Sequence, residues 1–190
     1  ASYANTTGNQ NVSVGMVALT ANTTGGGNVA VGSNAMQTST TAGNCTAVGA
    51  SALNASNAAD NTAVGYHSLL SNTTGSDNTA VGSIALDANT TGIQNTAVGG
   101  SALGANTTAN NNSAFGYGAL TSNTTGASNT AIGHKSLLVS TTASQNTAVG
   151  AASLYTNTTG TNNVALGKDA MYLNTTGSQN TAIGRASLNS

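Results

Sequence analysis

The chain has 190 residues, a formal net charge of −1 and 4 % charged residues, whereas an ordinary globular domain has about 25 %. Its three Lys and Arg residues form no basic patch for a nucleic-acid backbone, and no run approaches the roughly 20 apolar residues of a membrane-spanning helix. A single cysteine cannot form an internal disulfide. Low charge combined with abundant Asn, Thr, Ser, Ala and Gly is typical of a repetitive β structure.

The chain repeats itself every 17 residues. A glycine stands at the same place in each repeat, and only the step from Gly49 to Gly65 is 16 residues. A fixed period of this length predicts a solenoid whose coils stack on one another. The missing residue falls in the loop 54–60, which marks this loop as tolerant of a change in length. Positions below are counted from these motif glycines, which are Gly15, Gly32, Gly49, Gly65, Gly82, Gly99, Gly116, Gly133, Gly150, Gly167 and Gly184.

Each repeat opens with an Asn four residues before its motif glycine. Ten of the eleven repeats follow this rule, and Cys45 takes the place in the third. Asn side chains stacked at one place in successive coils predict an amide ladder, in which each amide bonds the coils above and below. Ligation of an ion or another ligand at each coil is the alternative. The predicted ladder is Asn11, Asn28, Asn61, Asn78, Asn95, Asn112, Asn129, Asn146, Asn163 and Asn180.

A short strand follows the Asn and ends just before the motif glycine. Its residues alternate between two faces, so the large apolar residue before the glycine and the Ala or Ser one position earlier face opposite sides. We expect the large residue to be buried and the small one to face outward, where another chain can approach. A bend at the glycine and a second short strand, ending at a Leu or Met four residues later, are expected to follow.

The predicted core therefore has two stripes. The stripe before the motif glycine is Val14, Val31, Val48, Val64, Val81, Val98, Phe115, Ile132, Val149, Leu166 and Ile183. The stripe after it is Leu19, Met36, Leu53, Leu69, Leu86, Leu103, Leu120, Leu137, Leu154, Met171 and Leu188.

Most repeats return through the sequence Asn-Thr-Thr-Gly, as in Asn22–Gly25 and Asn89–Gly92. Asn and Thr side chains bond nearby backbone and Gly allows a positive φ, so this segment is predicted to be a turn. The same triplets are N-glycosylation sequons, which would carry sugar only in a eukaryotic secreted protein.

These elements predict an all-β fold, a parallel β-solenoid of eleven coils of about 17 residues. It is a single repeat array over residues 1–190, and we expect it to be a segment of a longer fibre. Two large apolar side chains per coil make a thin core, so we also expect a homo-oligomer, in the simplest case a parallel homotrimer.

The motifs NVSVG (Asn11–Gly15), NVAVG (Asn28–Gly32) and NVALG (Asn163–Gly167) resemble the SVAIG-type head repeat of trimeric autotransporter adhesins. The NTAVG copies are similar to arrays in bacteriophage tail fibres and large bacterial surface proteins, and the resemblance covers the whole chain. It implies a left-handed β-roll, three chains packed side by side, and attachment to a host-surface glycan or protein. The repeat is longer than the usual head repeat, and the extra length lies in the NTTG loop.

No catalytic residue, metal ligand or cofactor-binding residue is predicted. His67 and His134 stand about four coils apart and have no repeated acidic partner. Regular calcium sites would need an Asp in every repeat, whereas the chain has four isolated ones. We therefore expect a non-catalytic structural and adhesive fibre segment, either an adhesin head or a fibre shaft, at the cell surface or elsewhere outside the cell, or on a virion.

Two alternatives remain open at this stage. The first is an ice-binding β-solenoid, for which the Thr three residues before the motif glycine in seven repeats would have to face outward in a regular array. Alternation places this Thr on the same side as the large apolar residue, which is expected to be inside. The second is a phage tail-fibre shaft, which differs mainly in its biological owner.

Overall fold

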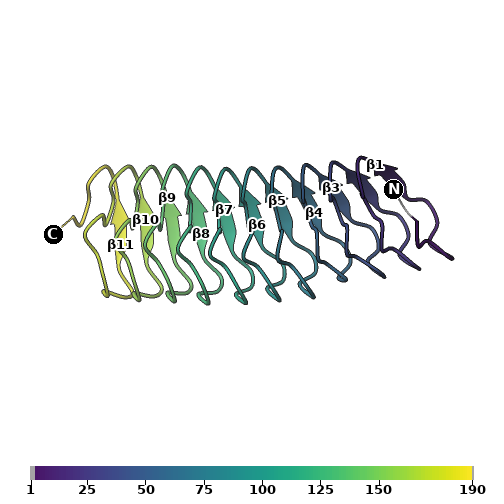
Figure 1. The fold of residues 1–190 in the computed structure, drawn as a ribbon. Helices are drawn as coiled ribbons and strands as arrows, with labels where there is room; N and C mark the ends of the chain where they lie inside the picture. Colours follow the sequence, from purple (N-terminus) through teal and green to yellow (C-terminus); the bar gives the residue numbers. More distant parts are fainter. Residues whose placement is uncertain (1–2, 190) are drawn as a thin grey trace.

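The computed structural model describes residues 3–189 and shows a rod of stacked coils, with the two chain ends at opposite ends of the rod (Figure 1). Eleven strands of three residues, one in each coil, form a single parallel sheet in sequence order. Residues 1–2 and 190, the outer limits of the predicted array, lie outside the described residues. The strands are β1 (Val12–Val14), β2 (Val29–Val31), β3 (Thr46–Val48), β4 (Thr62–Val64), β5 (Thr79–Val81), β6 (Thr96–Val98), β7 (Ser113–Phe115), β8 (Thr130–Ile132), β9 (Thr147–Val149), β10 (Val164–Leu166) and β11 (Thr181–Ile183).

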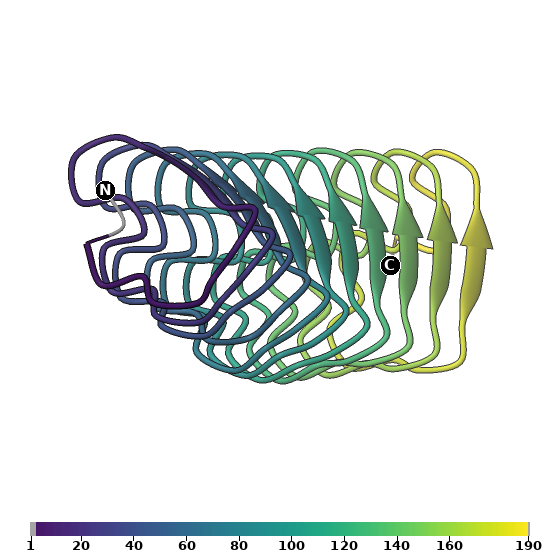
Figure 2. The same cartoon turned by 90° about the vertical axis from the view of Figure 1, so that its right-hand side faces the viewer.

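The same pairing register runs along the whole sheet. Between β5 and β6, for example, Ala80 pairs with Ala97 and Val81 with Val98. The strands lie on one side of the rod, and loops complete each coil on the other sides (Figure 2). The prediction of an all-β parallel solenoid is confirmed, whereas its left-handedness and trimeric state stay predictions.

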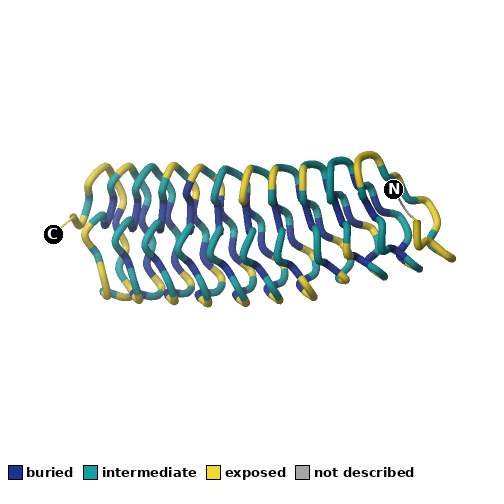
Figure 3. Tube along the Cα trace, in the orientation of Figure 1, coloured by how far each residue is buried: buried dark blue, intermediate teal, exposed yellow. Residues whose placement is uncertain are grey.

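The core lies on the opposite side of the strands from the one expected. In β6, Ala97 is fully buried, whereas Thr96 and Val98 are half-buried on the outer face. The interior of each coil holds one large side chain, such as Leu103, together with small ones such as Ala102. Buried stretches of the chain recur from coil to coil along the rod (Figure 3). Since protein interiors are close-packed, the Leu leaves room for only an alanine on the inner face of the strand.

The predicted core stripe before the motif glycine is therefore wrong. Strand alternation correctly places the small residue and the large apolar residue on opposite faces of the strand. Large apolar residues are also common on protein surfaces, however, so their size does not by itself indicate burial. The exposed members of this stripe are Val14, Phe115, Ile132 and Ile183, and the half-buried ones are Val31, Val48, Val64, Val81, Val98, Val149 and Leu166.

The predicted stripe after the motif glycine is confirmed in all coils but the last. Its fully buried members are Leu19, Met36, Leu53, Leu69, Leu86, Leu103, Leu120, Leu137, Leu154 and Met171. Leu188, in the last coil that the structure describes, is exposed. This stripe supplies the large apolar side chains of the interior.

The predicted second strand is also wrong, because residues 3–189 have only one strand in each coil. Ser101 and Leu103 have φ values of 58° and 51°, and this left-handed conformation ends an extended segment. It costs a residue with a side chain roughly 1–2 kcal/mol. Burying a leucine completely contributes about 1.5–3 kcal/mol, which offsets that cost. The chain therefore turns at this Leu, and the Leu side chain fills the interior of the coil.

The motif glycines fix the closest approach between coils. Gly99 has a φ of 136°, and a Cβ built on it would lie 2.5 Å from the carbonyl oxygen of Gly116 in the next coil. No side chain fits in that space, and the positive φ disfavours any other residue. The glycine is therefore required both by the bend and by the spacing of the coils.

The inverted core gives a direct test. An Ala97→Leu variant is expected to lose about 1–3 kcal/mol of unfolding free energy or more, because it overpacks a filled interior. Val98→Leu should be nearly neutral, since Leu166 already occupies the equivalent outer position in β10. Urea unfolding followed by circular dichroism measures both, and a larger loss for Val98→Leu would contradict the core assignment.

Candidate functional site

The predicted Asn ladder is confirmed, and it lies inside the coils. Asn112 is fully buried; its Oδ1 accepts from the backbone N–H of Asn129 (2.9 Å) and its Nδ2 donates to the carbonyl of Gly126 (2.9 Å). These amides therefore bind neighbouring coils, which opposes the ligand-binding alternative. Backbone N–H to Oδ1 bonds of 2.9–3.0 Å join Asn28 to Asn11, Asn78 to Asn61, Asn95 to Asn78, Asn112 to Asn95, Asn129 to Asn112, Asn146 to Asn129, Asn163 to Asn146 and Asn180 to Asn163.

Cys45 interrupts this ladder. Its backbone N–H donates to Oδ1 of Asn28 (3.0 Å), as an Asn would, and its thiol lies 3.4 Å from the carbonyl oxygen of Ala58. A thiol has no amide oxygen to accept from the next coil, so the series of bonds stops there. Burial raises the pKa of the Cys45 thiol above its ordinary value, which keeps it protonated and unreactive.

A second Asn ladder, which the sequence reasoning missed, runs through the NTTG turns. Asn89 is fully buried, and its Nδ2 donates to Oδ1 of Asn72 (2.9 Å) and to the carbonyl of Gly92 (3.0 Å). Since Nδ2 is the atom that carries an N-linked glycan, the folded coil does not present this sequon for glycosylation. The available signal was the strict position of this Asn, seven residues after the motif glycine.

Serine replaces Asn in the second ladder at Ser39, Ser56 and Ser140. Within the described residues, the buried hydroxyls of Ser39 and Ser140 have no hydrogen-bond partner. The Oδ1 atoms of Asn22 and Asn123, in the coils before them, are also left without one. Each such buried atom costs about 1–3 kcal/mol, so these places weaken the rod.

Filling one of these gaps should stabilise the chain. Ser140→Asn would supply an Nδ2 donor to Asn123, and the bond between Asn106 and the carbonyl of Ala109 shows that an Asn fits beside an Ala in this turn. We expect a gain of about 1 kcal/mol or more in unfolding free energy. Ser140→Ala, which only removes the hydroxyl, is the control; a Ser140→Asn variant less stable than this control would contradict the ladder.

The outer face of the sheet carries two ranks of side chains in register. One is the apolar residue before the motif glycine, and the other is the residue three before it, Thr in seven strands. Neighbouring members of each rank, such as Val81 and Val98, stand about 4.8 Å apart. The pattern changes in β7, where Ser113 and Phe115 replace the usual Thr and Val and the Phe is 40 % exposed. We call the surface formed by these two ranks the sheet face.

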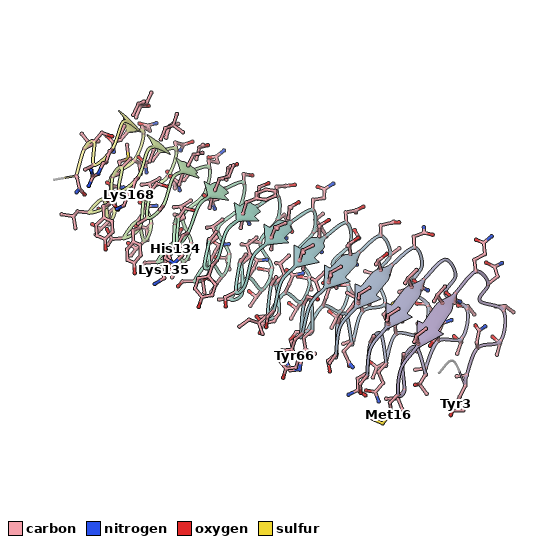
Figure 4. All side chains as sticks on the ribbon, turned by 90° about the horizontal axis from the view of Figure 1, so that it is seen from above. Tyr3, Met16, Tyr66, His134, Lys135 and Lys168 are labelled. Carbon is pink, nitrogen blue, oxygen red and sulfur yellow. The ribbon has the colours of Figure 1, made fainter. Side chains whose placement is uncertain are left out.

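A second surface gathers the distinctive side chains. Positions one, two and five after the motif glycine differ from coil to coil, and we call the surface they form the variable ridge. The labelled side chains in Figure 4, Lys168 and Tyr66 among them, follow one long edge of the rod. The ridge holds every Lys, Arg, His and Tyr of the chain: Tyr3, Tyr66, His67, Tyr117, His134, Lys135, Tyr155, Lys168, Tyr172 and Arg185.

The structure shows little that resembles a catalytic or metal site. Residues 3–189 contain no group of three His, Cys, Asp or Glu side chains that would hold a metal ion, and no pocket is present in this part of the chain. Asp87 lies near His67; partial burial raises the pKa of the Asp87 carboxyl, while backbone hydrogen bonds and the His67 charge oppose that rise. His134 is four coils beyond His67. The expectation that the chain is not an enzyme stays a prediction.

Comparison with protein-family models, curated proteins and solved structures finds no match for this chain. The resemblance to adhesin and tail-fibre repeats therefore rests on the motifs alone and stays a prediction. In the described part of the chain, no helix has the length and apolar character needed to cross a membrane.

Proposed function

We propose that the chain is a segment of a non-catalytic extracellular fibre, which associates with copies of itself through the sheet face and serves attachment. The observation that carries this proposal is the row of eleven apolar side chains on that face, from Val14 to Ile183, all of them exposed or half-buried. A contiguous apolar surface of this length is typical of protein–protein contact. With 4 % charged residues, the chain has little charge to keep such a face soluble when it is uncovered.

The sheet face suits a second copy of itself. Val, Ile and Thr are branched at Cβ and have few χ1 rotamers, so the two ranks form stiff ridges. Ridges of this kind interdigitate when sheets pack face to face about 10 Å apart. The Ala rank that was expected to meet the partner is inside the coil, and the apolar rank takes its place. A parallel homotrimer, the state that the resemblance to autotransporter heads implies, would cover three such faces around one axis.

Phe115 would set the register of this assembly. It stands between Val98 and Ile132 in the apolar rank, beside the small Ser113, and has a larger side chain than either neighbour in the row. In a parallel arrangement the Phe115 side chains of all copies meet at one level, where aromatic pairs stabilise by about 0.5–1.5 kcal/mol each. Slippage by one coil would place each ring against a Val or Ile instead.

The test is a triple variant, Val64→Glu, Val98→Glu and Ile132→Glu. These residues are outside the coil, so the fold should persist, but the carboxylates would be buried against one another in the assembly. We expect light scattering to give three times 18.2 kDa for the parent and 18.2 kDa for the variant. The matched control is Thr74→Glu, Thr108→Glu and Thr142→Glu, three exposed turn residues in the same coils, which should keep the parent mass. A parent that is monomeric at micromolar concentration would contradict the proposal.

Ice binding is the second candidate, and one observation favours it. The Thr rank faces outward, with Thr79 and Thr96 at the same place on adjacent strands, as an ordered array of hydroxyls on a rigid sheet requires. Against it, Ser113 and Phe115 interrupt the flat surface near the middle of the rod. A phage tail-fibre shaft would be the same kind of self-associating fibre, carried by a virion instead of a cell.

A thermal hysteresis assay separates the two candidates. We expect no hysteresis from the parent, because the sheet face would be covered by other copies. Ice binding would replace self-association as the function of this face if the parent shows hysteresis and if Thr79→Lys and Thr96→Lys abolish it. The exposed-turn variant Thr108→Lys is the control and should keep the hysteresis of the parent in that case.

A further inference from the structure

We propose that the C-terminal half of the variable ridge, from Tyr117 to Arg185, binds an acidic polysaccharide lying along the rod. This inference deepens the proposed attachment function and rests on it for its biological setting. It uses a surface separate from the sheet face, so self-association and ligand binding are compatible.

The charge of this half of the ridge is the first argument. Lys135, Lys168 and Arg185 are the only Lys and Arg residues of the chain, and they fall within four successive coils. Lys168 and Arg185 are exposed, and Asp169 is the one acid among them, 3.7 Å from the Lys168 ammonium. The result is a net charge of three minus one, or +2, in a chain whose total is −1. The complementary partner is an anion of low charge density.

Aromatic rings on successive coils are the second argument. Tyr155 and Tyr172 stack with ring centroids 4.9 Å apart and planes 13° from parallel. Tyr117 and His134 stack at 5.9 Å and 15°, and Tyr117 is 60 % exposed. Because stacked rings cover each other's faces, each stack offers its ring edges and its Tyr hydroxyls, which can hydrogen-bond to the hydroxyls of a sugar. Rings interleaved with cations therefore favour a sugar chain that carries carboxylates.

The spacing of these groups is the third argument. Groups at one position of the ridge recur about every 4.8 Å, because each coil adds one strand to the sheet. An extended polysaccharide advances by a similar distance with each pyranose unit, so successive units can meet successive coils. A nucleic acid fits less well, since its affinity depends on neutralising many phosphates and this half of the ridge offers three Lys and Arg side chains.

The N-terminal half of the ridge provides a natural comparison. Tyr66 stacks on His67 with centroids 3.8 Å apart, so an exposed tyrosine is present there too. The neighbouring His67 lies near Asp87, and residues 1–100 contain no Lys or Arg. Tyr66 thus has the same chemistry and the same ridge position as Tyr117 without the cations.

The experiment measures binding of polygalacturonate, a chain with one carboxylate per sugar, to the full-length chain by isothermal titration calorimetry. Dextran is the neutral probe and single-stranded DNA the alternative polyanion. We expect polygalacturonate to bind, and Lys168→Gln and Arg185→Gln each to weaken it by about three- to tenfold. Tyr172→Ala should weaken it by a similar factor, since an aromatic contact contributes about 0.5–1.5 kcal/mol. Tyr66→Ala should leave the affinity unchanged.

Three results would overturn the inference. The first is that polygalacturonate does not bind, and the second is that dextran binds with the same affinity as polygalacturonate. The third is that single-stranded DNA binds with the same affinity as polygalacturonate and that Tyr172→Ala leaves the affinity for DNA unchanged. Equal loss in Tyr66→Ala would also overturn it, because the site would then not be the cationic half. The Val64→Glu, Val98→Glu and Ile132→Glu variant separates this inference from the fibre proposal, since it should lose self-association and still bind the polysaccharide.

Discussion

Each coil backbone lies directly against the equivalent backbone of the next coil, and this contact determines most other features of the rod. At the motif glycine this contact leaves no room for a Cβ, as the approach of Gly99 to Gly116 shows. The distance between coils is set by the hydrogen bonds of a parallel sheet. Every coil must therefore follow nearly the same backbone path as its neighbour. A constant sequence period follows directly, because an extra residue must be looped out or else shift every later contact.

The narrow interior follows from the same constraint. One Leu or Met, two small residues and the buried amides fill each coil, so all further bulk and all charge must lie outside. In wider folds, apolar packing holds neighbouring segments in register. Here the buried amides do so, because an Asn that is hydrogen-bonded to the coils around it fixes their register and occupies little volume. The outside is then divided between the uniform sheet face and the irregular variable ridge, which can change without disturbing the interior.

The sequence predicts the period, the strand before each motif glycine, the inner Leu stripe and the first Asn ladder, because each is a residue type that recurs at a fixed position. It did not show which side of the strand is inside. Alternation places Ala97 and Val98 on opposite faces but does not show which face is inside, so the expectation that the larger residue is buried has no support from the pattern itself. The second strand failed for another reason: left-handed backbone at Leu103 is rare in general and is imposed here by the turn. For the turn amides, such as Asn89, the sequence predicts only a local role, because their ladder partners lie a full coil away in the chain.

Irregularities in the repeat are concentrated between residues 39 and 65. Cys45 interrupts the first ladder, Ser39 interrupts the second, and the only 16-residue step lies here. In this region the Thr40 N–H bonds the side chain of Asn57 (2.7 Å), whereas the equivalent Thr73 N–H bonds the Thr90 backbone carbonyl (2.9 Å). A side-chain acceptor is held less rigidly than a backbone carbonyl, and ladder bonds are missing at Ser39 and Cys45, so the bending stiffness of the rod is expected to be lower in this region. We expect the rod to flex here as at an elastic joint, so that the long C-terminal arm, with its charged ridge, can tilt to follow a curved surface while the remaining coils keep their alignment.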